Sequence, residues 1–274
     1  MLEEPNDLGA LTHDAIAGEL RITQRRHGHR YSIDDVLTAW EAASLAPDVF
    51  LRVRAHGRAS TRCLELGSGI GSVLLMLSHK LPEAHFVAVE AQQNSFRLLT
   101  ENVRQNALEP RVQLIHGDLR TEVHERIGDF ELVTGTPPYV PPGTATPSSD
   151  SQKAYARQEL RGGVEDYLAA MGRVLAPWGV GVICADARFP ERVFTGAERA
   201  GLCVFRQRDV VPRAGSKGPL FAVFCVAPAA AEGRPFERAP DFVARDEAGA
   251  RTADYIAVRA FFGIEQRSAE LPSP

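Results

Sequence analysis

The sequence lacks the features that would assign it to several large classes of protein. Its four cysteines include no close pair, and each lies in an apolar run, so neither a disulfide framework nor a zinc site is expected. No run approaches the roughly 18 apolar residues of a membrane span, and the N-terminal MLEEPNDLGA has no apolar signal core. We therefore expect a cytoplasmic protein with buried free thiols, without a metal or a membrane partner.

A large excess of charge of either sign is also missing. The chain has 31 Lys and Arg against 35 Asp and Glu, a formal net charge of −4. This balance argues against binding nucleic acid through bulk charge, although it permits a local basic patch. Hydrophobic residues make up 44% of the 274 residues, which is enough for the core of an ordinary globular domain.

Short apolar runs alternate with helical periodicity through most of the chain. Strands are expected at 62–66, 85–89, 112–115, 130–133, 180–185, 203–211 and 220–227. Helices are expected at 72–79, 92–106, 163–175 and 191–200. This order predicts an α/β fold of the Rossmann-like type, with a mainly parallel seven-stranded sheet, helices on both faces and an antiparallel edge hairpin.

The segments outside this pattern are expected to join it in one compact domain. An N-terminal extension is expected at 1–56 and the core at 57–228. A C-terminal excursion with a docking helix is expected at 229–274. The start of the extension is expected to be poorly ordered. An entry helix is expected at 34–45 and a Pro/Ser/Thr loop at 141–151. A surface excursion is expected at 228–240, and the docking helix at 254–262.

A glycine-rich turn, Glu65-Leu66-Gly67-Ser68-Gly69-Ile70-Gly71, follows the first core strand. Glycines let the backbone turn sharply and approach a ligand closely. A dinucleotide fingerprint would place a glycine or alanine at Ser72, and no Gly-Lys-Ser/Thr is present. The turn therefore indicates a nucleoside-type ligand without a cradled phosphate.

Two acidic residues follow the next strands. Glu90 closes the second strand, where a carboxylate can accept hydrogen bonds from both hydroxyls of a ribose. Asp118 follows the third strand and can accept from an adenine amino group, although such a residue alone is more often a turn aspartate. Open α/β sheets bind ligands at the carboxyl ends of their strands. The glycine turn, Glu90 and Asp118 all lie at such ends, so together they indicate a ligand site more specifically than each does alone.

The fourth strand ends in Thr136-Pro137-Pro138-Tyr139. Two prolines fix the backbone, so the Pro137 carbonyl and the Thr136 side chain point in set directions. These acceptors could hold an amino group by its N–H donors, while the ring that carries it stacks on Tyr139. A Pro-rich turn with a packing tyrosine is the alternative.

Together these motifs resemble class I methyltransferases acting on exocyclic or amide nitrogens, and more narrowly the bacterial valine-tRNA adenine-N6 methyltransferase family. The similarity runs from Arg21 to Ile264, and includes the entry segment 32–40 and the closing segment 245–262 with Tyr255. The resemblance implies S-adenosylmethionine as cofactor, tRNA as partner and methyl transfer to adenine N6. It implies cofactor contacts at Glu65, Gly67, Gly69, Gly71, Glu90 and Asp118, and catalytic roles for Thr136, Pro137 and Tyr139.

Two observations bear on the substrate. The family has asparagine where this chain has Thr136, and a hydroxyl is shorter than an amide, which leaves the identity of the base open. The basic stretch from Arg21 to Tyr31 is a candidate RNA-binding segment, with Arg25, Arg26, Arg30 and Tyr31 as substrate-binding residues.

Other functions remain compatible with the sequence. A glutamine-amide methyltransferase acting on protein has similar motifs, and a small-molecule methyltransferase would suit the missing asparagine and the negative net charge. A nucleotide-binding oxidoreductase or a catalytically silent binding module is a more distant alternative, because Ser72 and the intact Glu90 and Asp118 argue against both.

Overall fold

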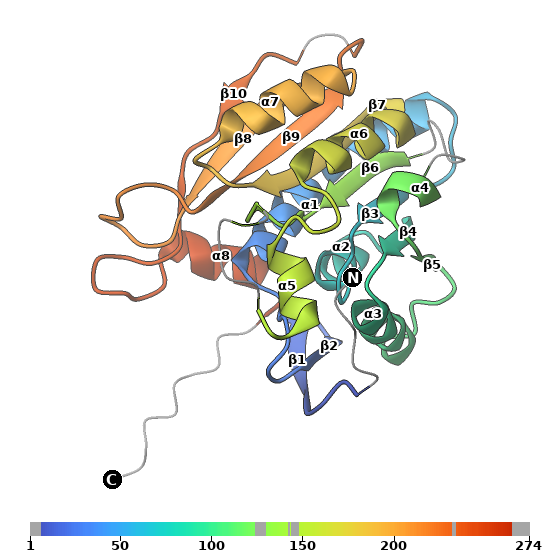
Figure 1. The fold of residues 1–274 in the computed structure, drawn as a ribbon. Helices are drawn as coiled ribbons and strands as arrows, with labels where there is room; N and C mark the ends of the chain where they lie inside the picture. Colours follow the sequence, from blue (N-terminus) through green and yellow to red (C-terminus); the bar gives the residue numbers. More distant parts are fainter. Residues whose placement is uncertain (1–6, 124–129, 142, 144–147, 232–233, 265–274) are drawn as a thin grey trace.

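The computed structural model describes residues 7–123, 130–141, 143, 148–231 and 234–264 (Figure 1). Its strands are β1 (Leu11–Ala17), β2 (Leu20–Arg25), β3 (Arg62–Leu66), β4 (His85–Glu90), β5 (Val112–His116), β6 (Phe130–Gly135), β7 (Leu175–Ala185), β8 (Leu202–Val211), β9 (Phe221–Pro228), β10 (Glu237–Arg238) and β11 (Phe242–Val243). Its helices are α1 (Ile33–Ala55), α2 (Ser72–Lys80), α3 (Gln93–Gln105), α4 (Leu119–Glu122), α5 (Ser151–Arg157), α6 (Val164–Val174), α7 (Pro190–Arg199) and α8 (Ala253–Phe261).

Nine strands of the described chain form the main sheet, in the order β10-β8-β9-β7-β6-β3-β4-β5, with β11 also paired to β8. The neighbouring pairs from β7 to β5 are parallel, whereas β9 runs antiparallel to β7 and β8. This confirms the predicted Rossmann-like α/β class and its antiparallel hairpin, and adds two short strands at one edge. The carboxyl ends of β3 to β7 consequently meet along one edge of the sheet.

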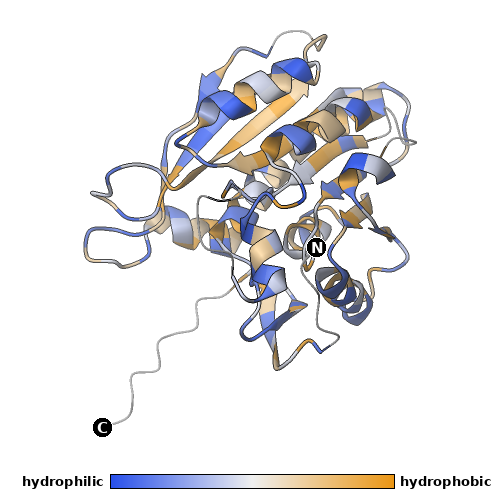
Figure 2. Ribbon diagram, viewed as in Figure 1, coloured by the Kyte–Doolittle hydropathy of each residue, from blue (hydrophilic) through white to orange (hydrophobic). Residues whose placement is uncertain are grey.

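Helices cover both faces of this sheet. One core cluster joins it to α1, α2, α3 and α8, and a second joins it to α4, α6 and α7. The central strands are mainly hydrophobic, as expected for strands buried on both faces, whereas α3 exposes a hydrophilic surface (Figure 2). A strand that is buried on both faces has apolar residues at successive positions. The central strands could therefore be predicted from continuous apolar runs.

The N-terminal segment differs from expectation, because β1 and β2 form an antiparallel hairpin. Ile16 and Ile22 are fully buried, and the hairpin packs against α2 and α3. The Thr23 amide donates to Asn102 Oδ1 at 2.7 Å. Residues 1–6, also expected to be poorly ordered, lie outside the described residues. Burial and this bond come from distant parts of the chain, which is why the local sequence did not reveal the hairpin.

Helix α1 continues past the predicted end at residue 45 and contains Pro47. A proline inside a helix removes one backbone hydrogen bond and costs about 3 kcal/mol. The helix nevertheless continues, because Val49 and Val53 in its second half are buried and burying each side chain contributes roughly 1.5–3 kcal/mol. Packing on the sheet therefore overrides the local signal.

Two predicted loops are partly ordered into other elements. The 228–240 excursion contains β10, which pairs with β8, although residues 232–233 lie outside the described chain. Ser151, at the end of the predicted 141–151 loop, begins α5, and residues 142 and 144–147 of that loop fall outside the described residues. None of the described helices has the length and apolar character needed to cross a membrane.

Candidate active site

The glycine turn between β3 and α2 has the backbone conformation that its sequence predicted. Gly67, Gly69 and Gly71 all have positive φ angles, of 60°, 55° and 86°. A Cβ at Gly67 would lie 2.1 Å from the Tyr167 hydroxyl, and one at Gly71 would lie 2.7 Å from Leu99, whereas Gly69 faces open space. Two of the glycines thus permit close packing, and the third leaves room on the ligand side.

Glu90 connects the end of β4 to this turn. One of its carboxylate oxygens accepts a hydrogen bond from the Gly69 amide at 2.7 Å, and the other accepts from the Gln92 amide at 2.6 Å. The side chain is almost fully buried and lines the cleft described below. These two bonds hold the carboxylate at the wall of the cleft, between the glycine turn and the residues that follow β4.

Glu65 lies beneath the turn and is not among the residues that line the cleft. Its carboxylate accepts from the Leu74 amide at 3.0 Å, one of the N–H groups at the start of α2 that have no partner within the helix. Burial, and secondarily the charge of Asp35, raises the pKa of Glu65 well above its ordinary value. The residue predicted to contact the cofactor therefore holds the beginning of α2 in place.

Asp118 lines the cleft, as predicted, but its carboxylate already has partners. It caps α4 by accepting from the Arg120 amide at 2.9 Å, and it accepts from the Arg120 guanidinium at 2.9 and 2.6 Å. The hydrogen bond to the Arg120 side chain is the main reason that the pKa of Asp118 is lowered. Leu119, the next residue, adds an apolar wall to the same part of the cleft.

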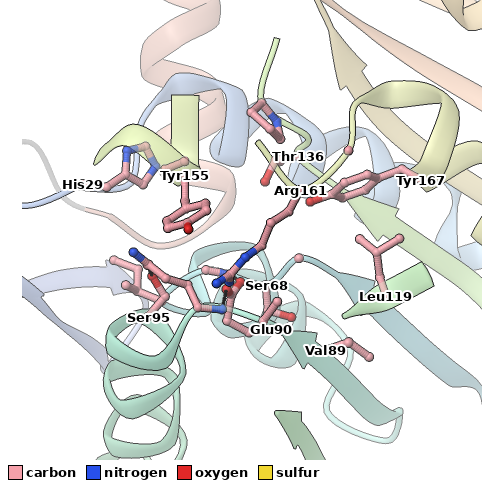
Figure 3. Close-up of a pocket in the computed structure, with 18 of the residues that line it drawn as sticks. His29, Ser68, Val89, Glu90, Ser95, Leu119, Thr136, Tyr155, Arg161 and Tyr167 are labelled. Atoms are coloured by element: carbon pink, nitrogen blue, oxygen red, sulfur yellow. Dashed lines mark hydrogen bonds between the residues drawn. The ribbon is translucent and has the colours of Figure 1, made fainter. Parts of the chain in front are cut away.

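The main cleft opens at the carboxyl ends of these strands and has a volume of about 880 Å³, including the space open to solvent. Of the residues predicted to form the site, those on its wall are Tyr31, Gly67, Gly69, Glu90, Asp118 and Thr136. Lining residues that sequence reasoning missed include His29, Asp35, Gln92, Tyr155, Arg161 and Tyr167. Figure 3 shows Arg161 reaching into the cleft toward Ser68 and Glu90.

The missed residues come from segments whose place depends on the tertiary structure. Tyr155 belongs to α5 and Arg161 follows it, and the Arg161 guanidinium lies 4.2 Å from the centre of the Tyr155 ring. Only Asp35 had a sequence signal, because Ser32 and Asp35 have the spacing of a capping box, and the Ser32 amide donates to Asp35 at 2.9 Å.

Acidic side chains gather on one side of the cleft. Asp35 is buried, and its burial together with the charge of Asp34 raises its pKa to about 7, against hydrogen bonds from the Ser32 amide and the Ser72 side chain that lower it. The charge of Asp35 also contributes to the raised pKa values of Glu65 and Tyr139. A cationic ligand would therefore be stabilised here.

The loop 136–139 lies between the main cleft and a second, smaller cavity of about 230 Å³, including the space open to solvent. Thr136 and Pro138 line the main cleft, whereas Pro137, Pro138 and Tyr139 line the second cavity together with Phe189. The Tyr139 hydroxyl donates a hydrogen bond to the Asp34 carboxylate. The ring predicted to hold a substrate base is thus next to the cofactor cleft and outside it.

The basic stretch 21–31 is largely used within the fold. Arg25 pairs with Asp150 at 2.9 Å, and its guanidinium also donates to the Leu8 carbonyl. Arg30 pairs with Asp14 at 3.0 Å. Of the three arginines predicted to contact RNA, only Arg26 has an exposed side chain without a hydrogen bond or ion pair in the described chain. Arg25 and Arg30 therefore contribute to the hairpin and its junction with α5, and their contact with RNA stays a prediction.

Comparison with known proteins is consistent with this geometry. Residues 46–157 match the family model of the methyltransferase small domain. The tRNA1(Val) (adenine(37)-N6)-methyltransferase of Bacteroides thetaiotaomicron is 27% identical over 61% of this chain and 69% of its own length. The human MTRF1L release factor glutamine methyltransferase is 34% identical over 28% of this chain and 24% of its own. A 4-amino-L-phenylalanine/4-methylamino-L-phenylalanine methyltransferase of Streptomyces pristinaespiralis is 26% identical over 56% of this chain and 55% of its own.

Solved structures give the same fold. A predicted O-methyltransferase from Agrobacterium tumefaciens matches 87% of this chain and all of its own, with a TM-score of 0.59 at 15% identity. The structure of M. jannaschii TYW2 in complex with AdoMet matches 80% of this chain and 85% of its own, with a TM-score of 0.50 at 15% identity.

The fold, the cleft at its strand ends and these matches define the chain as an S-adenosylmethionine-dependent methyltransferase of class I. Within this class it resembles the tRNA1(Val) (adenine(37)-N6)-methyltransferases, as its motifs indicated. The residues present fit the cofactor, since the open side of Gly69 leaves space for it and the cleft carries the carboxylates of Asp35, Glu90 and Asp118. Such a set suits a ligand with a sulfonium, an ammonium and ribose hydroxyls.

Proposed function

We propose that the enzyme methylates an exocyclic amino group of a base in tRNA or another RNA, with adenine N6 as the favoured acceptor. The observation that carries this proposal is the position of the loop 136–139 between the cofactor cleft and the second cavity. A planar base brought to this loop would lie against Tyr139, with its amino group at the Thr136 and Pro137 acceptors. A nucleotide in RNA would have to be splayed out or flipped to reach it.

We assign the cofactor contacts from the geometry of the cleft. Glu90 would bind the two ribose hydroxyls, because its carboxylate ends β4 at the wall of the cleft and is held beside the Gly69 amide. Asp118 and Leu119 would bind the adenine, and Asp35 would face the ammonium of the methionyl group. S-adenosylmethionine, when bound, supplies an electrophilic methyl group on a sulfonium.

The chemistry then requires orientation more than proton transfer. The Thr136 hydroxyl and the Pro137 carbonyl would accept the N–H groups of the substrate, which directs the nitrogen lone pair toward the methyl carbon. A nitrogen–carbon bond forms, the carbon–sulfur bond breaks, and the nitrogen loses one proton. Tyr139 would fix the plane of the ring from one side, and Phe189 lines the same cavity.

The direct test is methyl transfer from labelled S-adenosylmethionine to separate fractions of total tRNA, protein and small aromatic amines. We expect the label in tRNA, and mass spectrometry of the nucleosides should identify N6-methyladenosine. Label in a methylated cytosine would support amino-methylation of RNA but would show that the base is cytosine and not adenine. Label found only in protein or in free amines would overturn the proposal.

A second candidate is methylation of the amino group of a free aromatic amine. It is favoured by the similarity to the 4-amino-L-phenylalanine/4-methylamino-L-phenylalanine methyltransferase and by Thr136, which replaces the asparagine of the tRNA-methylating family. An aromatic amine presents the same flat ring and amino group as a nucleobase. The fractions of the same experiment decide between the two.

The raised pKa of Asp35 predicts how cofactor binding depends on pH. In the free enzyme the Asp35 carboxyl is protonated below about pH 7, and a cationic cofactor favours its ionised form. Affinity for S-adenosylmethionine should therefore rise between pH 6 and 7.5, by at most about ten-fold per pH unit. Conversely, the free protein loses stability as the pH rises from about 4 to about 7, because the fold raises the pKa of Asp35 from 3.8 to about 7 and so favours the protonated carboxyl.

Calorimetry across this range should reveal the dependence, and Asp35→Asn should remove most of it. Asp34, Glu65, Tyr139 and Cys184 interact electrostatically with one another or with Asp35, so the variant must also be compared in stability. An affinity that is independent of pH in the unmodified enzyme would contradict the assignment of Asp35.

A further inference from the structure

Helix α5 carries two cations that the fold itself does not use. Lys153 and Arg157 are four residues apart and consequently lie on the same side of the helix. Arg157 is exposed and Lys153 is half-buried, and within the described chain neither side chain forms a hydrogen bond or an ion pair. By contrast, Arg25 and Arg192, which also lie near α5, are paired with carboxylates.

The position of α5 places these charges at the rim of the cofactor cleft. Tyr155 and Ala156 of the same helix line the cleft. The helix is joined to the end of the β1–β2 hairpin through the Arg25–Asp150 ion pair and through the side chain of Gln152, which accepts from the His29 amide at 3.2 Å. Figure 1 shows α5 beside this hairpin.

His29 provides an independent indication that the cations are close to the cleft wall. Its pKa is lowered mainly by burial, and the charges of Arg157 and Lys153 lower it further, whereas that of Asp34 raises it. The ring of His29 lines the cleft. Arg26 is exposed on the segment that follows β2, and Gly28 of this segment lies against Gln152 of α5.

The neighbouring carboxylates do not neutralise this surface. Asp150 is paired with Arg25, and it also caps α5 by accepting from the Lys153 amide at 3.0 Å. Asp34 accepts hydrogen bonds from the Tyr139 and Ser32 hydroxyls. The cations of α5 and Arg26 are therefore not paired with these carboxylates, on a protein with a net charge of −4.

We propose that Arg26, Lys153 and Arg157, here called the α5 surface, bind the phosphates of the RNA strand on either side of the methylated nucleotide. The inference rests on the proposed function, because it assigns a partner to the same site. Exposed cations without internal partners can release counterions from a nucleic acid, and their position at the cleft rim is where a splayed strand must pass. The surface replaces the predicted contacts of Arg25 and Arg30.

The test is tRNA binding by the double variant Lys153→Ala, Arg157→Ala over a range of salt concentrations. The logarithm of the affinity should fall less steeply with the logarithm of salt, by about 1.4–1.8 units for two lost phosphate contacts. At low salt the affinity should fall roughly ten-fold or more. Binding of S-adenosylmethionine should be retained, because neither side chain lines the cleft.

The matched control is Arg52→Ala, Arg54→Ala, which removes two cations from the end of α1. Arg54 lies beside Thr61 and Ala84, just before β3 and β4, and hence at the edge of the sheet opposite to the cleft. This control should keep the salt dependence of the unmodified enzyme. An equal loss in both double variants, or an unchanged slope in the α5 variant, would overturn the α5 surface.

The unmodified enzyme separates this outcome from failure of the proposed function. If it neither binds nor methylates RNA, the proposed function fails, and the α5 surface fails with it. If it methylates tRNA while the α5 variant binds tRNA with unchanged affinity and slope, only the α5 surface is wrong. A charge-preserving variant, Lys153→Arg with Arg157→Lys, should restore the salt slope and so exclude a loss caused by unfolding of α5.

Discussion

Replacing Glu90 with alanine is expected to weaken S-adenosylmethionine binding by about a hundred-fold. Loss of a hydrogen bond to a charged group costs about 1.5–3 kcal/mol, which corresponds to roughly ten- to hundred-fold in affinity. The upper end is expected because Glu90 also accepts from the Gly69 and Gln92 amides and so fixes the glycine turn. Isothermal calorimetry measures the change directly.

Glu83→Ala is the matched control for this prediction. Glu83 precedes β4, whereas Glu90 ends it, so the two glutamates lie at opposite edges of the sheet. The control should bind the cofactor normally. Glu90→Gln should be nearly as weak as Glu90→Ala, because an amide nitrogen cannot accept from the backbone N–H groups. Undiminished binding in Glu90→Ala would contradict the ribose assignment.

Replacing Tyr139 with alanine is expected to remove most of the methyl transfer while cofactor binding stays close to normal. Stacking of a base on an aromatic side chain contributes about 1–3 kcal/mol, and each 1.36 kcal/mol changes a rate about ten-fold. Cofactor binding should persist because Tyr139 lines the second cavity and not the main cleft. Single-turnover transfer from labelled cofactor distinguishes the two effects.

Tyr139→Phe and variants of Thr136 separate the parts of this loop. Tyr139→Phe keeps the ring and loses the contacts of its hydroxyl with Asp34 and Cys184, so it should retain most of the turnover. Thr136→Ala should lower turnover modestly, because the Pro137 carbonyl remains as an acceptor. Thr136→Asn should preserve or raise methylation of adenine N6 if adenine is the substrate, and abolish activity if the substrate is a different one. Full activity in Tyr139→Ala would mean that the loop is only a turn.

Much of the core could be read from the sequence because its signals are local. The strands β3, β4, β6 and β9 are short, mainly apolar runs. The glycines at 67, 69 and 71 have the positive φ angles that only glycine adopts easily. The acidic residue that ends β4 and the proline pair after β6 follow from the rule that α/β sheets bind ligands at the carboxyl ends of their strands. These features predicted the fold, the cofactor and the reaction class together.

The roles of individual charged residues were less accessible. Glu65 and Glu90 are both glutamates at the ends of adjacent strands, yet one supports the start of α2 and the other lines the cleft. Arg25 and Arg30, which were predicted to contact RNA, pair within the fold with Asp150 and Asp14. A sequence identifies a charge but not its partner, because that partner comes from a distant segment.

The sequence by itself determined the class I methyltransferase core, its glycine turn and the loop 136–139, since backbone conformation and hydrophobic periodicity depend on neighbouring residues. The tertiary structure decided what surrounds them. It extended α1 through Pro47, folded the N-terminal segment into a hairpin, and brought Asp35, Tyr155 and Arg161 to the cleft. Burial and long-range pairing provided the free energy for these arrangements, and neither is encoded within any single stretch of the chain.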